Sequence, residues 1–124
     1  MSAIGIRHVH LLVTEHERAV AFYKDAFGMG ELFRDGPIVF VGTPGGGDSL
    51  ALHLAVTEEQ RARVGHQGGY GHFGIHLADR SAAAVDEAVH RVEKAGGRLL
   101  ERGEHAPGVP FAYVADIDGY TIEI

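Results

Sequence analysis

Short stretches of alternating apolar and polar residues predict β-strands along much of the chain. In the first stretch, residues 4–13, one face carries Ile6, His8, His10 and Leu12. Similar alternation covers residues 31–34, 38–43, 50–56, 72–79, 98–102, 109–115 and 120–124. Because Asp118-Gly119 accepts the positive φ of a tight turn, the last two stretches are predicted to form a hairpin. The pattern therefore predicts eight strands.

Two longer stretches have apolar residues at helical spacing. The first carries Ala19, Phe22, Tyr23 and Ala26 and stops at Gly28, and the second carries Val85, Ala88, Val89 and Val92 and stops at Gly96-Gly97. Thr14 with Glu17 predicts a capping box for the first helix, and Ser81 or Asp79 caps the second. A short helical segment is expected to begin at residues 57–59.

The order strand-helix-strand-strand-strand thus occurs twice, with the two helical stripes offset by 66 residues (85 − 19). Module one spans residues 1–64, a glycine-rich linker spans 65–70, and module two spans 71–124. A chain of 124 residues that is 45% hydrophobic suits one domain with one core. We therefore expect an α+β domain whose two halves are related by a pseudo-twofold axis.

Composition narrows the function classes. The net charge is −6 without any long basic run, which argues against nucleic acid or an anionic membrane as a partner. The absence of cysteine excludes disulfides, thiolate metal sites and a cysteine nucleophile. The sequence shows neither a secretory leader nor an apolar run near the ~20 residues of a membrane span, so a cytoplasmic location is predicted.

Several of the nine histidines fall within predicted strands, which suggests a metal site. His8 and His72 open the two modules, while His53 and Glu123 lie late in them. Imidazoles with a carboxylate suit Fe, Mn, Ni, Co or Zn. At ~3.3 Å per residue, His72 and His76 are about 13 Å apart and His8 and His10 about 6.6 Å, so neither pair shares an ion readily. Periodicity alone leaves open which member of each pair is the ligand. The remaining histidines, His16, His66, His90 and His105, are predicted to be solvated.

Three segments resemble the vicinal oxygen chelate superfamily, which includes glyoxalase I, fosfomycin-resistance thiol transferases, extradiol dioxygenases and bleomycin-resistance proteins. They are His8-Val9-His10-Leu11-Leu12-Val13 with the helix containing Phe22-Tyr23, then His72-Phe73-Gly74-Ile75-His76-Leu77, and finally Asp116-Ile117-Asp118-Gly119-Tyr120-Thr121-Ile122-Glu123. The resemblance implies two βαβββ modules forming a cupped, incompletely closed eight-stranded mixed sheet with helices outside.

The same resemblance implies that His8, His72 and Glu123 are metal ligands. His53 stands where glyoxalase I has a fourth, carboxylate ligand, and Tyr113 matches a tyrosine that faces substrate in the fosfomycin enzymes. His10 and His76 are expected to contact substrate. In the cross-chain arrangement of short family members, His8 and His53 come from one chain of a homodimer and His72 and Glu123 from the other.

The expected function is a divalent-metal-dependent enzyme that chelates two neighbouring oxygens of a small substrate. Glyoxalase-like isomerase or lyase chemistry and dioxygenase chemistry both fit, with Glu123 as the general base. The alternative is a metal-free protein of the bleomycin-resistance type that sequesters a drug or natural product in a dimer groove. A degenerate module whose site only supports folding is the third interpretation.

Overall fold

The computed structural model describes residues 2–124, so Met1, the first residue of the predicted module one, lies outside the described residues. The elements are, in chain order, β1(Val9–Val13), α1(His16–Phe27), β2(Gly30–Asp35), β3(Ile38–Gly42), β4(Leu50–Leu54), α2(Glu58–Arg63), β5(Phe73–Gly74), α3(Ala82–Lys94), β6(Arg98–Glu104), β7(Pro110–Ala115) and β8(Thr121–Glu123). The order βαβββ occurs twice, with α2 between the two copies, which confirms the predicted α+β fold. The module limits at residues 64 and 71 stay predictions.

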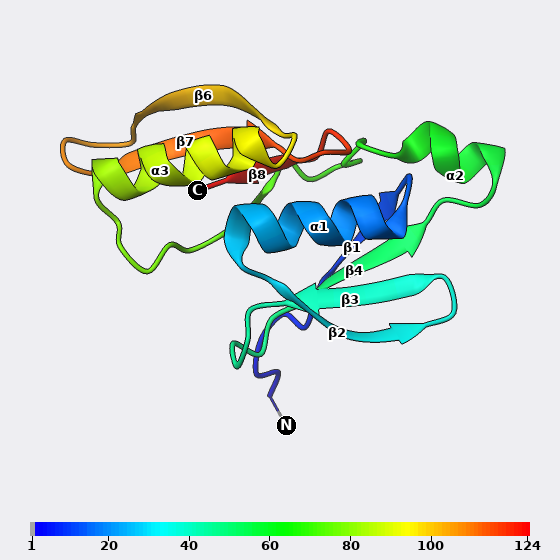
Figure 1. Ribbon diagram of the computed structural model, residues 1–124. Helices are drawn as coiled ribbons and strands as arrows, with labels where there is room; N and C mark the ends of the chain where they lie inside the picture. Colours follow the sequence, from blue (N-terminus) through cyan, green and yellow to red (C-terminus); the bar gives the residue numbers. More distant parts are fainter. Residues whose placement is uncertain (1) are drawn as a thin grey trace.

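The strands form two separate mixed sheets rather than one continuous eight-stranded sheet within the chain (Figure 1). The first sheet has the order β1-β4-β3-β2 and the second β5-β8-β7-β6. In each sheet the first strand runs parallel to its neighbour and the other pairs are antiparallel. Strands β1 and β5 each have one neighbour and therefore one free edge. Neither sheet is closed.

One hydrophobic core joins the helices to one face of each sheet. The predicted stripe of α1 is buried, as is that of α3, and the two helices contact each other. Alternate residues of the strands, such as Leu11, Leu52 and Ile122, complete the core. By alternation, the opposite faces of the sheets carry His8, His10 and Glu123. We call these the open faces, and they hold the candidate chemistry.

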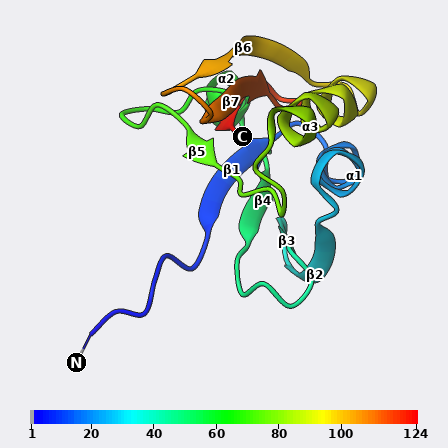
Figure 2. The same ribbon diagram turned by 90° about the vertical axis from the view of Figure 1, so that its left-hand side faces the viewer.

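Several local predictions are wrong at the ends of elements. Helix α1 begins after Glu15, which makes no side-chain capping bond, so the capping box predicted at Thr14 does not form. By contrast, Ser81 caps α3 by accepting from the amide of Ala84. Strand β1 begins at Val9 rather than at residue 4, because residues 2–8 have no partner strand and extend away from the body of the molecule (Figure 2).

Strand β5 is also shorter than the predicted stretch 72–79. It pairs with β8 through Phe73 and Gly74 only, and one further bond joins the Ile75 amide to the Glu123 carbonyl. Beyond that point the chain runs to α3 without a strand neighbour. The histidine at each end of this segment, His72 and His76, is therefore held by a short piece of strand.

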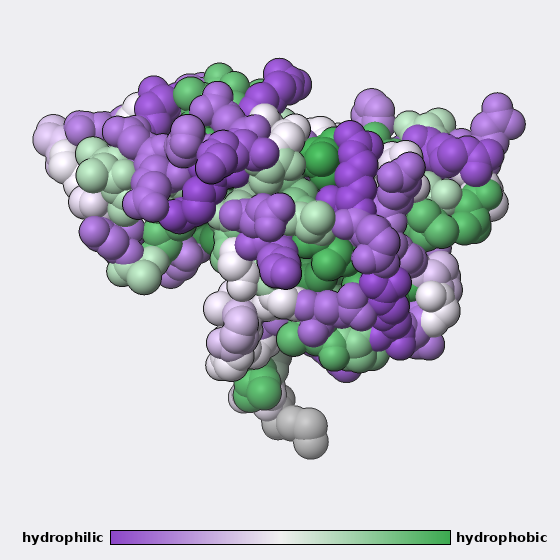
Figure 3. Space-filling model, viewed as in Figure 1, coloured by the Kyte–Doolittle hydropathy of each residue, from purple (hydrophilic) through white to green (hydrophobic). Residues whose placement is uncertain are grey.

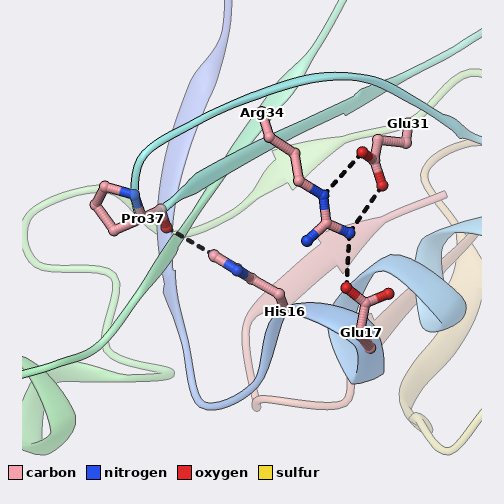
Figure 4. A network of polar contacts seen from close by, with 5 residues as sticks. All are labelled: His16, Glu17, Glu31, Arg34 and Pro37. Carbon is pink, nitrogen blue, oxygen red and sulfur yellow. Dashed lines mark hydrogen bonds and ion pairs between the residues drawn. The ribbon is translucent and has the colours of Figure 1, made fainter.

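Polar contacts tie the β2–β3 hairpin to the start of α1 (Figure 4). Arg34 bonds Glu17 at 2.6 Å and Glu31 at 2.8 Å, and His16 Nε2 donates to the Pro37 carbonyl at 2.6 Å. His16, predicted to be solvated, is partly exposed and in addition makes this one bond. These groups are exposed, so each ion pair contributes little stability. Their role is to fix where the hairpin lies against the helix.

A buried polar contact joins the two modules. The Tyr23 hydroxyl on α1 donates to Asp116 Oδ2, while Asp116 Oδ1 accepts from the amides of Asp118 and Tyr120, each at 2.9 Å. Both side chains are buried, and burial raises the pKa of Asp116 above its ordinary value. The hairpin between β7 and β8 turns through Gly119 at φ 98°, as the Asp118-Gly119 pair predicted.

The surface reflects this arrangement. Hydrophilic residues predominate over α3, whereas apolar residues emerge near the β2 edge, where Leu32 and Phe33 are half exposed (Figure 3). Among the described residues, none of the helices has the length and apolar character needed to cross a lipid bilayer.

Candidate metal centre

Strand β8 places Glu123 on the open face of the second sheet, between two histidines. Its Oε1 lies 2.9 Å from His72 Nε2, and its Oε2 lies 2.8 Å from His105 Nε2. Tyr113 is the β7 partner of Glu123, and its ring lies edge-on to that of His72 with centroids 4.9 Å apart. The structure thus brings together the predicted residues His72, Glu123 and Tyr113.

His105 is a member of this cluster that the sequence prediction missed. It follows β6, and its ring stacks on Phe111 at a centroid distance of 4.2 Å and an interplanar angle of 16°. The position was predicted to be a solvated loop because the alternating pattern was taken to end at residue 102. Strand β6 continues to Glu104 and delivers His105 to the carboxylate. The one signal in the sequence was Phe111, an aromatic residue on the same strand face as Tyr113 against which a ring such as that of His105 could stack.

Hydrogen bonds from the histidines control the charge of Glu123. The bond from His105, followed by that from His72, holds the pKa of Glu123 below its ordinary value. Burial, with a further contribution from the Glu123 charge, raises the pKa of Tyr113. At neutral pH the centre therefore pairs an ionised carboxylate with a protonated phenol.

Module one presents a related arrangement around His8, but without the carboxylate. The His8 ring lies edge-on to Phe40 with centroids 5.8 Å apart, as His72 does to Tyr113. In the two parallel strand pairs, Val9 aligns with Leu50 and Phe73 aligns with Ile122. The position equivalent to Glu123 is therefore Ala51.

This register corrects the predicted match between His53 and Glu123, which is wrong by two residues. His53 aligns with Leu12 on β1, further along the sheet than Ala51. A shift of two residues leaves a side chain on the same face of a strand, so the alternating pattern cannot detect it. Module one contributes His8 at the symmetry-matched place and offers no carboxylate beside it.

The predicted histidines line three cavities, one of which, of about 340 Å³, is lined by His76 together with Glu123 and His105. His8, His72 and His76 line a cavity of about 730 Å³ between the modules. His10 and His53 line a different cavity, of about 410 Å³, with ring centroids 5.3 Å apart. Burial, followed by the charges of His53 and His8, lowers the pKa of His10. Within residues 2–124, no three His, Cys, Asp or Glu side chains form a group positioned to hold a metal ion.

Comparison with known proteins identifies the family. The model of the Glyoxalase/Bleomycin resistance protein/Dioxygenase superfamily matches residues 5–124. The chain belongs to this superfamily. That result confirms the resemblance carried by the three sequence segments. No curated protein is significantly similar to the chain in sequence.

Solved structures of the glyoxalase superfamily share the fold. A glyoxalase-related enzyme from Fulvimarina pelagi is 25% identical, with a TM-score of 0.71 over 98% of this chain and 87% of that one. Lactoylglutathione lyase from Agrobacterium tumefaciens is 23% identical, with a TM-score of 0.69 over 98% and 92%. A mutant of the fosfomycin resistance protein FosX from Listeria monocytogenes, complexed with Mn(II) and 1S,2S-dihydroxypropylphosphonic acid, is 18% identical, with a TM-score of 0.73 over 98% and 90%.

The donor set of this glyoxalase-superfamily chain fits a divalent transition metal. Neutral imidazole nitrogens and an ionised carboxylate are accepted by Mn, Fe, Co, Ni and Zn. His72 Nε2 and the Glu123 carboxylate already converge, and the low pKa of Glu123 keeps it in the form that coordinates metal. Because His105 contacts the second carboxylate oxygen, it can orient Glu123 while Oε1 faces His72 Nε2, the other candidate ligand.

Proposed function

We propose that the protein is a divalent-metal-dependent enzyme that acts on a small substrate with two neighbouring oxygen atoms. The observation that carries this proposal is the convergence of the His72 and His105 nitrogens on the Glu123 carboxylate, on an open sheet face. Membership of the glyoxalase superfamily supports it. So does the FosX neighbour, which was solved with Mn(II).

His8, His72 and Glu123 would hold the ion. His53 is left out of this set because the residue of module one that is equivalent to Glu123 by strand register is Ala51, not His53. Three protein ligands leave coordination positions for two substrate oxygens. When bound, the ion would supply Lewis-acid stabilisation of negative charge that develops on those oxygens.

The protein's own residues would handle the proton and orient the substrate. Glu123, ionised at neutral pH, is the candidate general base for an acidic C–H of the substrate. Tyr113 lies across the strand pair from Glu123 and stays protonated, so its hydroxyl can donate to a substrate oxygen. His76 lines the same cavity as His8 and His72, which suits a substrate contact.

We further propose that the centre is completed in a homodimer. Strands β1 and β5 have free edges, and the two sheets do not join within the chain. The segment before β1 extends into solvent, with Ile6 88% exposed (Figure 2). Joining β1 of one copy to β5 of another would cover both edges and build an eight-stranded cup. His8 would then meet His72 and Glu123 of a second copy.

The reaction is a glyoxalase-like isomerase or lyase reaction, or an oxygen-dependent ring cleavage, carried out in the cytoplasm. The lyase and FosX neighbours favour the first class. Oxygen uptake with catechols as test substrates distinguishes the two, since only a dioxygenase consumes oxygen.

Metal content tests the proposal. The protein is purified without an affinity tag and its bound metals are counted by mass spectrometry, alongside His72→Ala and the control His90→Ala. His90 is an exposed residue of α3, so its removal changes the histidine count without touching the centre. We expect one transition-metal ion per chain in wild type and control, and loss in His72→Ala. Protein that takes up none of Fe, Mn, Ni, Co or Zn favours the metal-free sequestering function instead.

A further inference from the structure

The second cavity, of about 410 Å³, is separate from the metal centre and has its own chemistry. Strands β1 and β4 contribute His10 and His53, helix α2 contributes Gln60 and Arg63, and the segment before β5 contributes Tyr70. Its volume lies within the range of small-molecule sites. We call it the polar cavity.

The polar cavity offers hydrogen-bond donors and no carboxylate. The Arg63 guanidinium has five N–H groups and makes no ion pair among residues 2–124. Gln60 presents donors as well, because its Oε1 already accepts from the amides of Val56 and Thr57. Although the chain has a net charge of −6, no Asp or Glu side chain of the described residues lines this cavity. Such a lining favours an anion.

His53 supplies an independent observation. Its Nδ1 is buried without a hydrogen-bond partner in the described part of the chain. Buried polar atoms nearly always have a partner, so this nitrogen is kept at a cost to stability in a ring that also lines the cavity. The His10 ring lies beside it, with centroids 5.3 Å apart and the two ring planes tilted by 42°.

We propose that the polar cavity binds the carboxylate of a small organic acid. Arg63 would grip the two carboxylate oxygens with its planar fork, and the His53 ring, which lines the cavity, would contact the body of the ligand. Arg63 is the one Lys or Arg side chain in the lining formed by residues 2–124, which matches a monoanion better than a phosphate dianion. The imidazole rings and Leu12 suit a ligand with a partly apolar body.

The position of the cavity gives the proposed enzyme a substrate class. His10 follows His8 by two residues on the same strand face, a separation of about 6.6 Å. A substrate whose two oxygens bind the ion beside His8 would therefore reach the polar cavity with a carboxylate a few bonds from those oxygens. Because His8, His10 and Arg63 all lie within residues 1–64, this relation holds whichever chain supplies His72 and Glu123. This last step rests on the proposed function, whereas carboxylate binding by the cavity does not.

Titration calorimetry on the full chain, stripped of metal with EDTA, tests the proposal with benzoate and inorganic phosphate as probes. The variant is Arg63→Gln and the matched control is Arg61→Gln. Arg61 lies on the same helix and carries the same charge, but it does not line the cavity. Imidazole nitrogen shifts in NMR spectra report whether His53 senses the ligand.

We expect saturable benzoate binding in wild type and in the control, a loss of at least tenfold in affinity in Arg63→Gln, and a shift of the His53 nitrogens. No saturable binding of benzoate, equal affinity in the two variants, or tighter binding of phosphate than of benzoate would overturn the proposal. Removing metal separates the two proposals: benzoate binding in metal-free protein tests the cavity, and metal retention in His72→Ala tests the metal centre.

Discussion

Replacing Tyr23 by Phe removes one hydroxyl from the contact that joins the two modules. Its hydroxyl is the donor to Asp116 Oδ2, while the other carboxylate oxygen keeps its two backbone amides. Phe fills the same volume apart from the oxygen, so packing changes little. The perturbation therefore isolates one hydrogen bond to a buried carboxyl.

The expected cost follows from the burial. A hydrogen bond to a charged group contributes about 1.5–3 kcal/mol, and Asp116 is 4% exposed, so water cannot replace the lost donor fully. We take about 2 kcal/mol. An unfolding entropy of about 2.1 cal/mol/K per residue, over 124 residues, gives about 0.26 kcal/mol/K, and hence a fall in Tm of about 8 °C.

The effect should depend on pH. Burial raises the folded-state pKa of Asp116, so its contribution to stability is greatest below the unfolded pKa and is lost as pH rises through the folded pKa. The Tyr23 bond favours the ionised carboxylate, so its removal raises that pKa further. The difference between wild type and variant is therefore full at neutral pH and shrinks as pH falls through the pKa of Asp116.

Thermal unfolding followed by circular dichroism at neutral and acidic pH measures both effects. Tyr70→Phe is the control, because Tyr70 is 44% exposed and its substitution should change stability by less than about 0.5 kcal/mol. A Tm for Tyr23→Phe equal to that of the control, or a difference that does not shrink in acid, would refute the reasoning.

Three further predictions concern the site and the fold. Mixing His8→Ala with Glu123→Ala restores metal binding in the mixed dimers only, which rebuild one intact centre, as measured by metal analysis before and after subunit exchange. His105→Ala weakens metal affinity about tenfold in competition with a chelator, because Glu123 loses its orienting partner. Gly97→Ala costs about 3 kcal/mol in denaturant unfolding, because its Cβ would lie 2.4 Å from the Ala115 carbonyl oxygen.

Each of these has a result that contradicts it. If the mixed dimers stay metal-free, the centre is not built from His8 of one chain and Glu123 of the other. An affinity for His105→Ala equal to that of His90→Ala would make the contact with Glu123 incidental. Gly97→Ala should be compared with Gly69→Ala, whose Cβ meets nothing within 4 Å at an ordinary φ, and equal stability would contradict the clash.

The sequence predicts most of the fold because the period of the apolar residues differs clearly between strand and helix. The stripes of α1 and α3 are buried as predicted, and so is the core face of β8 through Ile122. The ends of elements depend on partners that the pattern does not contain. Residues 4–8 alternate as a strand does, yet they lack a neighbouring strand within the chain.

The site is only partly predictable for a related reason. Alternation places His53 on the open face correctly, but it cannot tell His53 from Ala51 as the equivalent of Glu123, because both choices preserve the face. His105 contacts Glu123 because β6 extends to Glu104 and because the His105 ring stacks on Phe111. Neither feature can be read from the alternating pattern. The separation of His10 and His53 into another cavity depends on how α2 covers the sheet.

The most direct test of the central claim is a crystal structure of the protein grown with Zn²⁺, with anomalous scattering used to locate the metal. The account predicts an anomalous peak about 2.1 Å from a His72 nitrogen and from a Glu123 carboxylate oxygen, with His8 of the same site as the third ligand. A peak bound instead by His10 and His53, or none in protein that is otherwise well ordered, would contradict it.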